Sequence, residues 1–252
     1  ANEFAKLGHN VVITSRRQAD IASVTEEMNN KSKGRIIGQV CDISDKNQLE
    51  ALWDLAKTEF NTVDYWINNA GYASGQSKVH EVPESLIHSM IDTNSLGTLF
   101  GSQVAITGFR KQGSGNLYNM LGGSFDGKRI TPGMGVYSST KASINIMTKY
   151  LVSENKNTNI TIGSISPGVL ITDNWLNEQK RLSAEEWKKS KPMVNMICDH
   201  VETATPWIVE QILLNKKSGK RIAWLTTWKI ISRVFQTKIL GRKRDLFSRY
   251  GI

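Results

Sequence analysis

The chain has 252 residues, of which 39% are hydrophobic and 22% charged, which is enough for one domain with a sizeable core. No segment approaches the roughly 18 uninterrupted apolar residues of a membrane-spanning helix, and the first residues lack the basic-then-apolar order of a signal peptide. We therefore expect an intracellular, cytoplasmic protein. The cysteines Cys41 and Cys198 and the four histidines show no metal-ligand spacing, so we assign neither a disulfide nor a metal site.

The net charge of +9 is concentrated at one end of the chain. Between Lys216 and Ile252 there are eleven basic residues against one acid, Asp245, which gives +10 and leaves −1 for all the residues before them. A basic charge spread over a whole protein would indicate nucleic-acid binding, but here it belongs to the tail alone. We expect no nucleic-acid partner.

Short β-branched segments alternate with longer helical patterns, which is typical of βαβ units on a parallel sheet. We predict strands at Asn10–Thr14, Arg35–Cys41, Val63–Ile67, Asn116–Met120, Ile160–Ile165 and Arg221–Leu225. We predict helices near Ala19–Asn30, Lys46–Phe60, Pro83–Lys111, Gly135–Glu154 and Val201–Asn215. This order predicts an α/β fold of the Rossmann type, with a doubly wound parallel sheet and helices on both faces.

Tyr137 and Lys141 stand four residues apart in the predicted helix Gly135–Glu154, so their side chains lie on one face of it. A free tyrosine has a pKa of about 10, and a nearby cation favours its ionised form. We therefore expect Lys141 to lower the pKa of Tyr137, so that the phenol exchanges protons near neutral pH. The same spacing also arises by chance as a surface pair, so the interpretation depends on the motifs around it.

Four further motifs accompany this pair: Asn68-Asn-Ala-Gly71 after a strand, Asn94 in Asp-Thr-Asn-Ser-Leu-Gly, Ser124 thirteen residues before Tyr137, and Pro167-Gly-Val-Leu-Ile-Thr172. In this order and spacing the residues resemble the short-chain dehydrogenase/reductase family, from the first residue to about residue 225. The resemblance implies hydride transfer between NADP(H) and a small-molecule carbonyl or alcohol, with Tyr137 as the acid/base. It also implies that Lys141 binds the nicotinamide ribose, and that the protein forms a homo-oligomer, a dimer or a tetramer.

The opening residues are typical of the second half of a helix, because Phe4 and Leu7 share a face and Gly8 stands where a C-cap belongs. In the resembled family this helix follows a first strand and a glycine-rich turn that binds the cofactor pyrophosphate. We expect that roughly 15 to 20 residues, the usual length of a strand plus turn, are missing before Ala1. The alternative, a natural variant without that strand, would leave backbone groups unpaired within the sheet.

Cofactor contacts are expected directly after the strands, beginning with Ser15, Arg16 and Arg17. Guanidinium groups at this position favour the 2′-phosphate of NADP(H), whereas an acidic side chain usually holds a cofactor without it; the alternative is a solvated basic pair. By resemblance, the other cofactor-binding residues are Asp42, Ile43, Asn69, Ala70, Gly71, Tyr137, Lys141, Pro167, Gly168 and Thr172. Asp42 is alternatively a helix N-cap, a role that Ser44 would also fill, and the remaining segments are alternatively ordinary turns.

The resemblance assigns catalytic roles to Asn94 and to a serine. Asn94 resembles the residue that holds a water between the lysine and solvent, and an asparagine in mid-helix is otherwise a poor helix former. The family carries its serine three residues after the asparagine that ends the preceding strand, here Asn119, but this position is Gly122. We predict that a two-residue insertion moves the role to Ser124, the alternative being a serine without a role in a glycine-rich loop.

Local strings such as Trp66–Gly71 and Thr93–Gly97 are similar to the chlorophyll b reductases and their bacterial relatives within this family. That similarity implies NADPH-dependent reduction of an aldehyde or ketone on a bulky lipophilic substrate. The segment Asp173–His200 corresponds to the family's substrate lid, although its many lysines and glutamates equally suit a solvated helix. We predict that the pocket under this lid is lined by Trp175, Leu176, Trp187 and Met193.

The tail, residues 226–252, is predicted to lie outside the catalytic domain 1–225. It combines apolar residues at helical spacing with basic ones, a pattern typical of helices on anionic membrane surfaces. The alternative is that its apolar side packs on its own domain or on a partner subunit. The apolar residues are Trp228, Ile231, Val234, Phe235 and Ile239, and the basic ones are Lys229, Arg233, Lys238 and Arg242.

Two other functions stay open at this point. One is a catalytically silent cofactor-binding or scaffold protein of the same fold, which the displaced serine and the absent glycine-rich turn would suit. The other is a membrane-associated adaptor that acts through its basic tail. The combination of Asn94, Tyr137 and Lys141 favours the enzyme.

Overall fold

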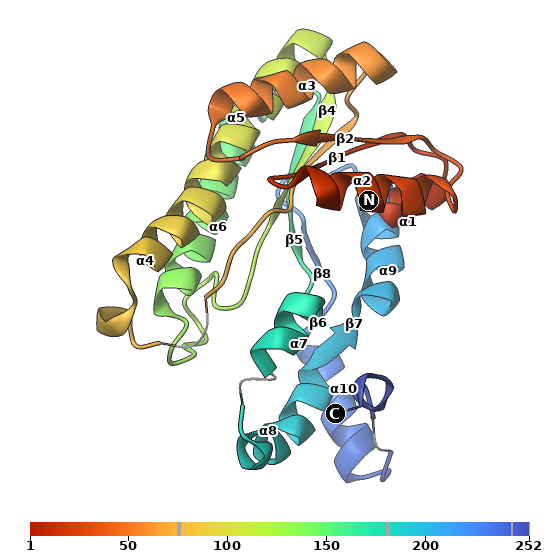
Figure 1. The fold of residues 1–252 in the computed structure, drawn as a ribbon. Helices are drawn as coiled ribbons and strands as arrows, with labels where there is room; N and C mark the ends of the chain where they lie inside the picture. Colours follow the sequence, from red (N-terminus) through yellow and green to blue (C-terminus); the bar gives the residue numbers. More distant parts are fainter. Residues whose placement is uncertain (75–76, 180–181, 243, 252) are drawn as a thin grey trace. The chain divides into compact units, whose positions relative to one another are not determined.

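The computed structural model describes residues 1–252 except 75–76, 180–181, 243 and 252, and excludes the side chains at 174 and 178 (Figure 1). Its internal contacts define two compact units. The first comprises Ala1–Ser164 with Asn215–Arg221, and the second comprises Ile165–Leu214 with Ile222–Ile252. The division of function between residues 1–225 and 226–252 stays a prediction.

The first unit is built on parallel strand pairs. Strand β1 (Val11–Ser15) pairs with β2 (Ile36–Val40), and β3 (Tyr65–Asn68) pairs with β4 (Gly115–Met120). The sheet of β3 and β4 continues into β5 (Ile160–Ser166) and β8 (Arg221–Ala223), in the order β3-β4-β5-β8. Helices connect the strands, which confirms the predicted Rossmann-type α/β fold.

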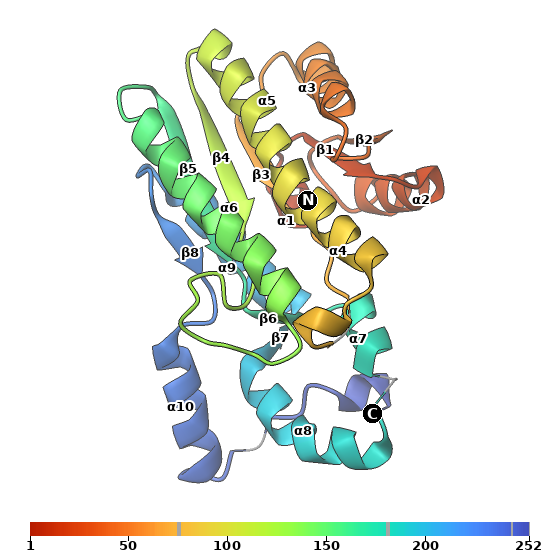
Figure 2. The same cartoon turned by 90° about the vertical axis from the view of Figure 1, so that its left-hand side faces the viewer.

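Helices separate the strands of the first unit along the chain. They are α1 (Asn2–Lys6), α2 (Gln18–Asn29), α3 (Lys46–Phe60), α4 (Glu84–Met90), α5 (Gly97–Gln112) and α6 (Gly135–Glu154), with a short 3-10 turn, η1 (Val79–Glu81). Figure 2 shows α5 and α6 side by side across strands β3 and β4. The functional candidates of this unit lie at or after the carboxyl ends of β1 to β4 or on helix α6, except Asn94, which lies between α4 and α5.

Helix α3 forms where the sequence supplies both a cap and an apolar stripe. Asp45 is the N-cap, and its carboxylate accepts a hydrogen bond from the Asn47 amide at 2.9 Å. Leu49, Leu52, Trp53 and Ala56 follow at helical spacing and are all buried. The Trp53 ring packs on Gly108 of α5, where a Cβ would overlap it, so glycine lets the two helices approach closely.

The helix predicted as one segment from Pro83 to Lys111 is divided in the structure, so this prediction was wrong in its continuity. Between α4 and α5 lies a π-helix, η2 (Ile91–Leu96), which contains Asn94. The Asn94 side chain is fully buried and bonds the backbone of the loop after β3, a tertiary contact that helical periodicity does not reveal. Such wide turns are frequent at functional sites.

The second unit contains two three-residue strands that the sequence did not predict. Strand β6 (Val169–Ile171) pairs in parallel with β7 (Cys198–His200). Helices α7 (Asp173–Gln179), α8 (Ala184–Ile197), α9 (Val201–Leu214) and α10 (Thr227–Lys238) complete the unit with a 3-10 turn, η3 (Ser248–Tyr250). Cys-Asp-His in β7 lacks the apolar pattern of a strand, which explains why it was missed.

The core of the second unit includes residues from the C-terminal segment. Phe247 is fully buried; its ring stacks on Trp175 with centroids 5.4 Å apart and meets Trp187 edge-on at 5.1 Å. Leu176 packs on the same cluster, whereas Met193 is 55% exposed. Three of the four predicted pocket residues therefore pack into this core, and the tail is part of it.

None of the helices in the described part of the chain combines the length and apolar character that crossing a membrane requires.

Candidate active site

Lys141 and Tyr137 lie on helix α6, and Lys141 is almost completely buried. The Lys141 ammonium donates a hydrogen bond to the Met120 carbonyl at the end of β4, with Nζ and O 3.3 Å apart. It lies 5.7 Å from the centroid of the Tyr137 ring. The structure therefore brings the predicted pair together, at the carboxyl end of a central strand.

Burial, and not the lysine charge, dominates the pKa of both groups. Loss of solvent raises the pKa of the Tyr137 phenol above its ordinary value and lowers the pKa of Lys141 to about 8. The prediction that Lys141 lowers the pKa of Tyr137 was wrong for this structure. At neutral pH the pair is a protonated phenol beside a charged ammonium, which suits the donation of a proton to a substrate oxygen.

Asn94 binds the loop after β3 through both the oxygen and the nitrogen of its side-chain amide. Its Oδ1 accepts from the Tyr72 amide at 2.7 Å, and its Nδ2 donates to the Tyr72 carbonyl at 2.8 Å and to Thr140 Oγ1 at 2.9 Å. The Thr140 hydroxyl in turn donates to the Tyr137 carbonyl at 2.7 Å. Asn94 thus links the loop after β3 to the helix turn that carries Tyr137.

Gly71 leaves a small space between Asn94 and Lys141. A Cβ placed on Gly71 would lie 3.2 Å from Lys141 Nζ and 3.5 Å from Asn94 Oδ1, so both polar atoms border the same volume. A side chain at position 71 would crowd the ammonium. The water-holding role of Asn94 stays a prediction, and these two atoms are polar partners of the kind that a bound water needs.

Gly122, the position at which the family carries its serine, lies directly against Tyr137. A Cβ at Gly122 would overlap the Tyr137 hydroxyl and lie 3.0 Å from Lys141 Cγ. Ser124 adopts a left-handed backbone with φ +58°, and its hydroxyl donates to the Arg129 carbonyl within its own loop. A side chain at position 122 would therefore meet the Tyr137 hydroxyl where it now lies, while the catalytic role of Ser124 stays a prediction.

The residues after β2 are arranged by Ser44 and Asp45. Asp42 Oδ1 accepts from the Ser44 amide at 2.9 Å and from the Ser44 hydroxyl at 2.7 Å; these bonds, aided by the Arg16 charge, lower the pKa of Asp42. Neither alternative cap was right, because Asp45 caps α3. Ile43 packs on Gly97 of α5. Asp42 and Ile43 therefore form an ordered turn at the strand end.

Ser15 is the last residue of β1 and not the first residue after it, whereas Arg16 and Arg17 follow the strand as predicted. The Arg17 guanidinium pairs with Asp20 at 2.7 Å, and the Ser15 hydroxyl donates to the same carboxylate at 3.4 Å. Arg16 is exposed. Asn69 and Ala70, after β3, are also exposed. The strand ends of the first unit thus present guanidinium groups and exposed residues, a combination suited to phosphate and ribose.

Pro167, Gly168 and Thr172 belong to the second unit. Gly168 has φ +78° and packs on Leu225, where a Cβ would lie 2.6 Å from the Leu225 Cβ, so only glycine fits. The Thr172 hydroxyl accepts from the Trp175 amide at 3.3 Å at the start of α7. Their contact with a nicotinamide stays a prediction.

The sequence analysis did not identify two groups of polar residues near the site. The first is Thr140, which joins Asn94 to the Tyr137 backbone; its position one residue before Lys141 was the available signal. The second is a buried amide pair at the ends of β3 and β4, where Asn68 Nδ2 donates to Asn119 Oδ1 at 2.8 Å. Asn119 Nδ2 donates onward to Thr148 Oγ1 of α6 at 3.0 Å. These bonds fix the strand ends relative to the helix that carries the pair.

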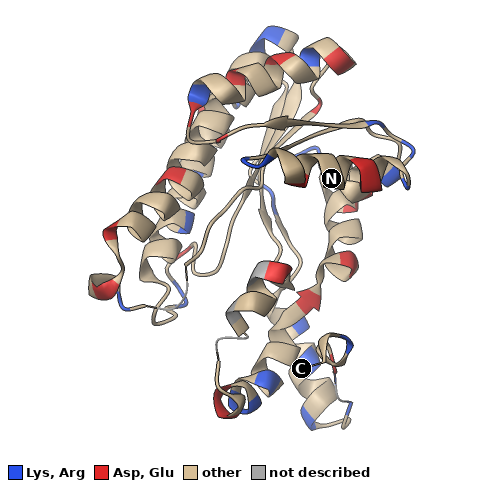
Figure 3. Cartoon of the chain, in the orientation of Figure 1, with Lys and Arg blue, Asp and Glu red and all other residues tan. Residues whose placement is uncertain are grey.

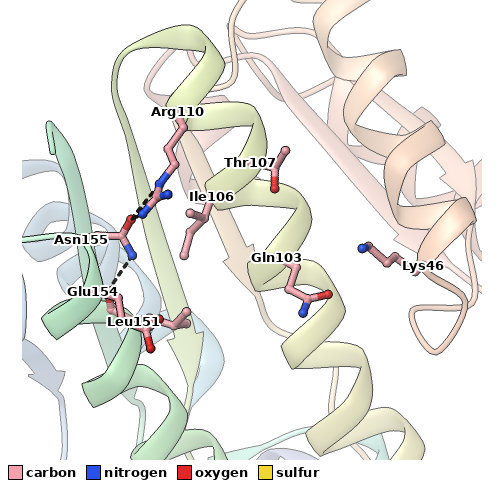
Figure 4. Close-up of a pocket in the computed structure, with 8 residues that line it drawn as sticks. All are labelled: Lys46, Gln103, Ile106, Thr107, Arg110, Leu151, Glu154 and Asn155. Carbon is pink, nitrogen blue, oxygen red and sulfur yellow. Dashed lines mark hydrogen bonds between the residues drawn. The ribbon is translucent and has the colours of Figure 1, made fainter.

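Two surface cavities lie along helices of the first unit. One, of about 360 Å³, lies between α5 and α6, where Arg110 donates to Asn155 (Figure 4). None of its lining residues is a candidate site residue. The other, of about 440 Å³, is lined by Thr140 together with residues of η1, η2 and the first turns of α6. This second cavity therefore borders the candidate site at Thr140, which joins Asn94 to the Tyr137 backbone.

The sequence of residues 1–183 matches the family described as short chain dehydrogenase. The chain belongs to the short-chain dehydrogenase family. Membership shows that the chain is an oxidoreductase with an NAD(P)-binding Rossmann fold. The roles of Tyr137 and Lys141 were predicted from resemblance to this same family. Members of this family typically bind small-molecule substrates and form oligomers.

Several relatives of known name are similar over most of the chain. The chloroplastic chlorophyll(ide) b reductase NOL of Oryza sativa subsp. japonica is 30% identical over 257 residues, which cover 98% of this chain and 73% of that protein. The chloroplastic NYC1 proteins of Arabidopsis thaliana and Oryza sativa subsp. japonica are 29% identical, and the chain spans 48% of their length. The predicted similarity to the chlorophyll b reductase branch is confirmed, whereas a cytoplasmic location stays a prediction.

A solved structure of a 7α-hydroxysteroid dehydrogenase, complexed with NADH and 7-oxo glycochenodeoxycholic acid, has the same fold. It superposes with a TM-score of 0.75 over 88% of this chain and 86% of that chain, at 21% identity. At this identity the likeness concerns the fold alone.

Proposed function

We propose that this protein is an NADPH-dependent reductase of an aldehyde or ketone on a bulky lipophilic molecule. The observation that carries the proposal is the position of Lys141. Its buried ammonium lies beside the Tyr137 ring, the Met120 carbonyl and the space bordered by Asn94. A buried lysine with a pKa near 8 costs stability, and such a cost is typical of functional sites.

The residues of the first unit suit a nicotinamide dinucleotide. The space beside Gly71 would be filled by a Cβ, and the exposed residues Asn69 and Ala70 would bond a ribose or phosphate through their backbone. Arg16 and Arg17 would bind the 2′-phosphate, and Lys141 would bind ribose hydroxyls. When bound, the cofactor supplies the hydride.

The protein's own residues would manage the proton. Tyr137 is protonated at neutral pH and donates its hydroxyl proton to the substrate oxygen. The Lys141 charge stabilises the phenolate that remains. Asn94 holds the loop after β3 and the helix turn of Tyr137 together through its bonds to Tyr72 and Thr140. Ser124 would polarise the same substrate oxygen, which requires its hydroxyl to leave the Arg129 carbonyl.

NADPH oxidation with panels of aldehydes, ketones and formyl tetrapyrroles tests the reaction. In Tyr137→Phe we expect turnover to fall by about 10²–10⁴-fold with little change in the Kd for NADPH. Tyr150→Phe, on an exposed part of the same helix, is the matched control and keeps its turnover. Equal turnover in Tyr137→Phe and wild type would refute the mechanism. Cofactor binding without turnover on any panel would support the silent scaffold instead.

Ser124 needs its own pair of variants because its backbone is left-handed. Ser124→Gly relieves the positive φ and Ser124→Ala keeps it, but both remove the hydroxyl. If the hydroxyl polarises the substrate, both variants lose turnover by at least about tenfold. A loss in the alanine variant alone would mean that the loop conformation matters and that Ser124 is not catalytic.

Cofactor preference is tested at Arg16. Arg16→Ala is expected to weaken NADPH binding by about tenfold while leaving NADH binding unchanged, because only NADPH carries the 2′-phosphate. Arg17→Ala, which also removes the pair with Asp20, is expected to act in the same direction. Equal effects of Arg16→Ala on both cofactors would contradict the proposed preference.

A further inference from the structure

Helix α10 exposes a row of large apolar side chains. Trp228 is 79% exposed, Ile231 50% and Phe235 52%, and the C-cap Ile239 and the following Leu240 are 67% and 54% exposed. The first four recur at spacings of three and four residues, so they lie along one face of the helix. Isolated exposed apolar residues are ordinary, but a continuous row of this size marks an interaction surface.

The opposite side of α10 anchors the helix to its own unit through charge. Arg233, which is 8% exposed, donates from Nη2 to both Asp199 oxygens at 2.8 and 2.6 Å and from Nη1 to the Met196 carbonyl at 2.9 Å. Asp199 also accepts from Arg244 at 2.8 Å and from the Trp224 indole at 2.8 Å. The buried Arg233 thus anchors one side of the helix, while the apolar row leaves half or more of each side chain exposed.

Positive charge surrounds the apolar row. Lys238 and Arg242 are exposed at the end of the helix, and Lys229 lies over the Trp224 ring with Nζ 2.9 Å from its centroid. From Ile222 to Ile252 the sequence contains one acid, Asp245. Figure 3 shows basic residues along the segment that ends at the C-terminus, and both acidic and basic residues on α8. Burial lowers the pKa of Lys229 to about 8, so it is largely charged at neutral pH.

We propose that α10 binds the surface of an anionic lipid bilayer, with its axis in the membrane plane. The apolar row would enter the boundary between headgroups and acyl chains, and the lysines and arginine would contact lipid phosphates. The indole of Trp228 suits this boundary because it has an apolar body and a polar N–H. This surface is independent of the reaction proposed above and would operate with any substrate.

A second copy of the chain fits this face less well. A symmetric contact between two α10 helices would bring the same basic groups together, Lys238 and Arg242 of each copy, with no acid on the helix to offset them. An anionic bilayer supplies the complementary charge and an apolar layer at the same depth. The charge around the row therefore favours the bilayer.

The full-length protein is tested by co-sedimentation with vesicles of phosphatidylcholine alone and of phosphatidylcholine mixed with phosphatidylglycerol. We expect binding to the mixed vesicles that weakens with salt. Phe235→Glu should reduce the partition coefficient by about tenfold or more, and Lys238→Glu by several-fold. The matched controls are Val24→Glu on the exposed side of α2 and Lys33→Glu, which should bind like wild type.

A dye attached at position 235 reports the contact directly. Both native cysteines are buried, and burial raises the pKa of Cys198 to about 12, so a Phe235→Cys variant is labelled selectively. Mixed vesicles should shift the emission of an environment-sensitive dye at position 235 to shorter wavelength but leave a Val24→Cys label unchanged. Absence of wild-type binding, or equal binding by Phe235→Glu, overturns the proposal. A change in oligomer mass on Phe235→Glu without vesicle binding identifies a second copy as the occupant and likewise overturns it.

Discussion

Replacing Lys141 with methionine is expected to stabilise the protein at neutral pH while it abolishes turnover. Lys141 is 3% exposed, and within the described part of the chain its ammonium donates one hydrogen bond, to the Met120 carbonyl. A buried charge with so few partners lowers the stability of the folded state. Methionine has a similar length and flexibility and introduces no charge.

The magnitude follows from the pKa. Its lowering from 10.5 to about 8 corresponds to roughly 3 kcal/mol of cost for keeping Lys141 charged in the folded protein. Loss of the bond to the Met120 carbonyl offsets about 1 kcal/mol of the gain. We therefore expect Lys141→Met to raise the free energy of unfolding by about 2 kcal/mol at pH 7.

The gain has a defined pH dependence. Because the folded pKa lies below the unfolded pKa, the cost is fully present below pH 8, where both states carry the proton. Between about pH 8 and 10.5 only the unfolded state keeps it, so wild-type stability rises with pH relative to the variant. The advantage of Lys141→Met should therefore disappear by about pH 10.

Urea unfolding of both proteins at about pH 7 and about pH 10 measures this difference, since the other titrating groups are common to both. Lys111→Met, at an exposed position on α5, is the control and should change stability by less than about 0.5 kcal/mol. A Lys141→Met variant that is less stable than wild type at pH 7, or whose advantage persists at pH 10, would refute the reasoning.

Two further substitutions test the packing of each unit. Gly122→Ala places a methyl group against the Tyr137 hydroxyl, so we expect kcat to fall by about tenfold or more with the fold retained, as checked by steady-state kinetics and circular dichroism. Asp199→Asn leaves buried guanidinium charge uncompensated and should cost about 3–5 kcal/mol in urea unfolding, whereas Glu185→Gln in an exposed pair should cost under about 1 kcal/mol. Unchanged kcat in the first variant, or equal costs in the second comparison, would contradict these readings of the structure.

Local sequence signals were sufficient for much of the first unit. Helices α3 and α6 begin and end at the predicted residues, because each has a regular apolar stripe and a clear boundary in its own sequence. Strands β1 to β5 fall within about two residues of their predicted ends, as is usual for elements bounded by turn residues. The parallel fold followed from their alternation with helices.

Features that depend on distant residues were not predictable in the same way. The π-helix exists where Asn94 bonds a loop 22 residues earlier, and β7 pairs with a strand whose residues lie 29 positions away. Phe247 belongs to the core of the second unit because the aromatic rings of α7 and α8 surround it. No local pattern in the tail distinguishes this phenylalanine from the exposed Phe235.

The spacing in the sequence was enough to predict which residues form the pair, but not how their pKa values change in the fold. A four-residue interval brings Tyr137 and Lys141 to one face of a helix whatever surrounds it. The directions of their pKa changes depend on burial, which the rest of the fold decides. In the same way, the reason for a glycine at position 122 becomes visible only when the Tyr137 ring lies against it.

Burial of both groups also sets the pH range in which the site can reduce a carbonyl. Below about pH 8, Lys141 is charged and Tyr137, with its raised pKa, holds the proton that the substrate oxygen requires. As the pH rises through about 8, Lys141 loses its charge first, and the phenolate left by proton donation loses its nearest cation. Turnover with saturating NADPH should therefore decline with an apparent pKa near 8, below the pKa of a free tyrosine. A profile that stays flat to about pH 10 would mean that the Lys141 charge is not required for proton transfer.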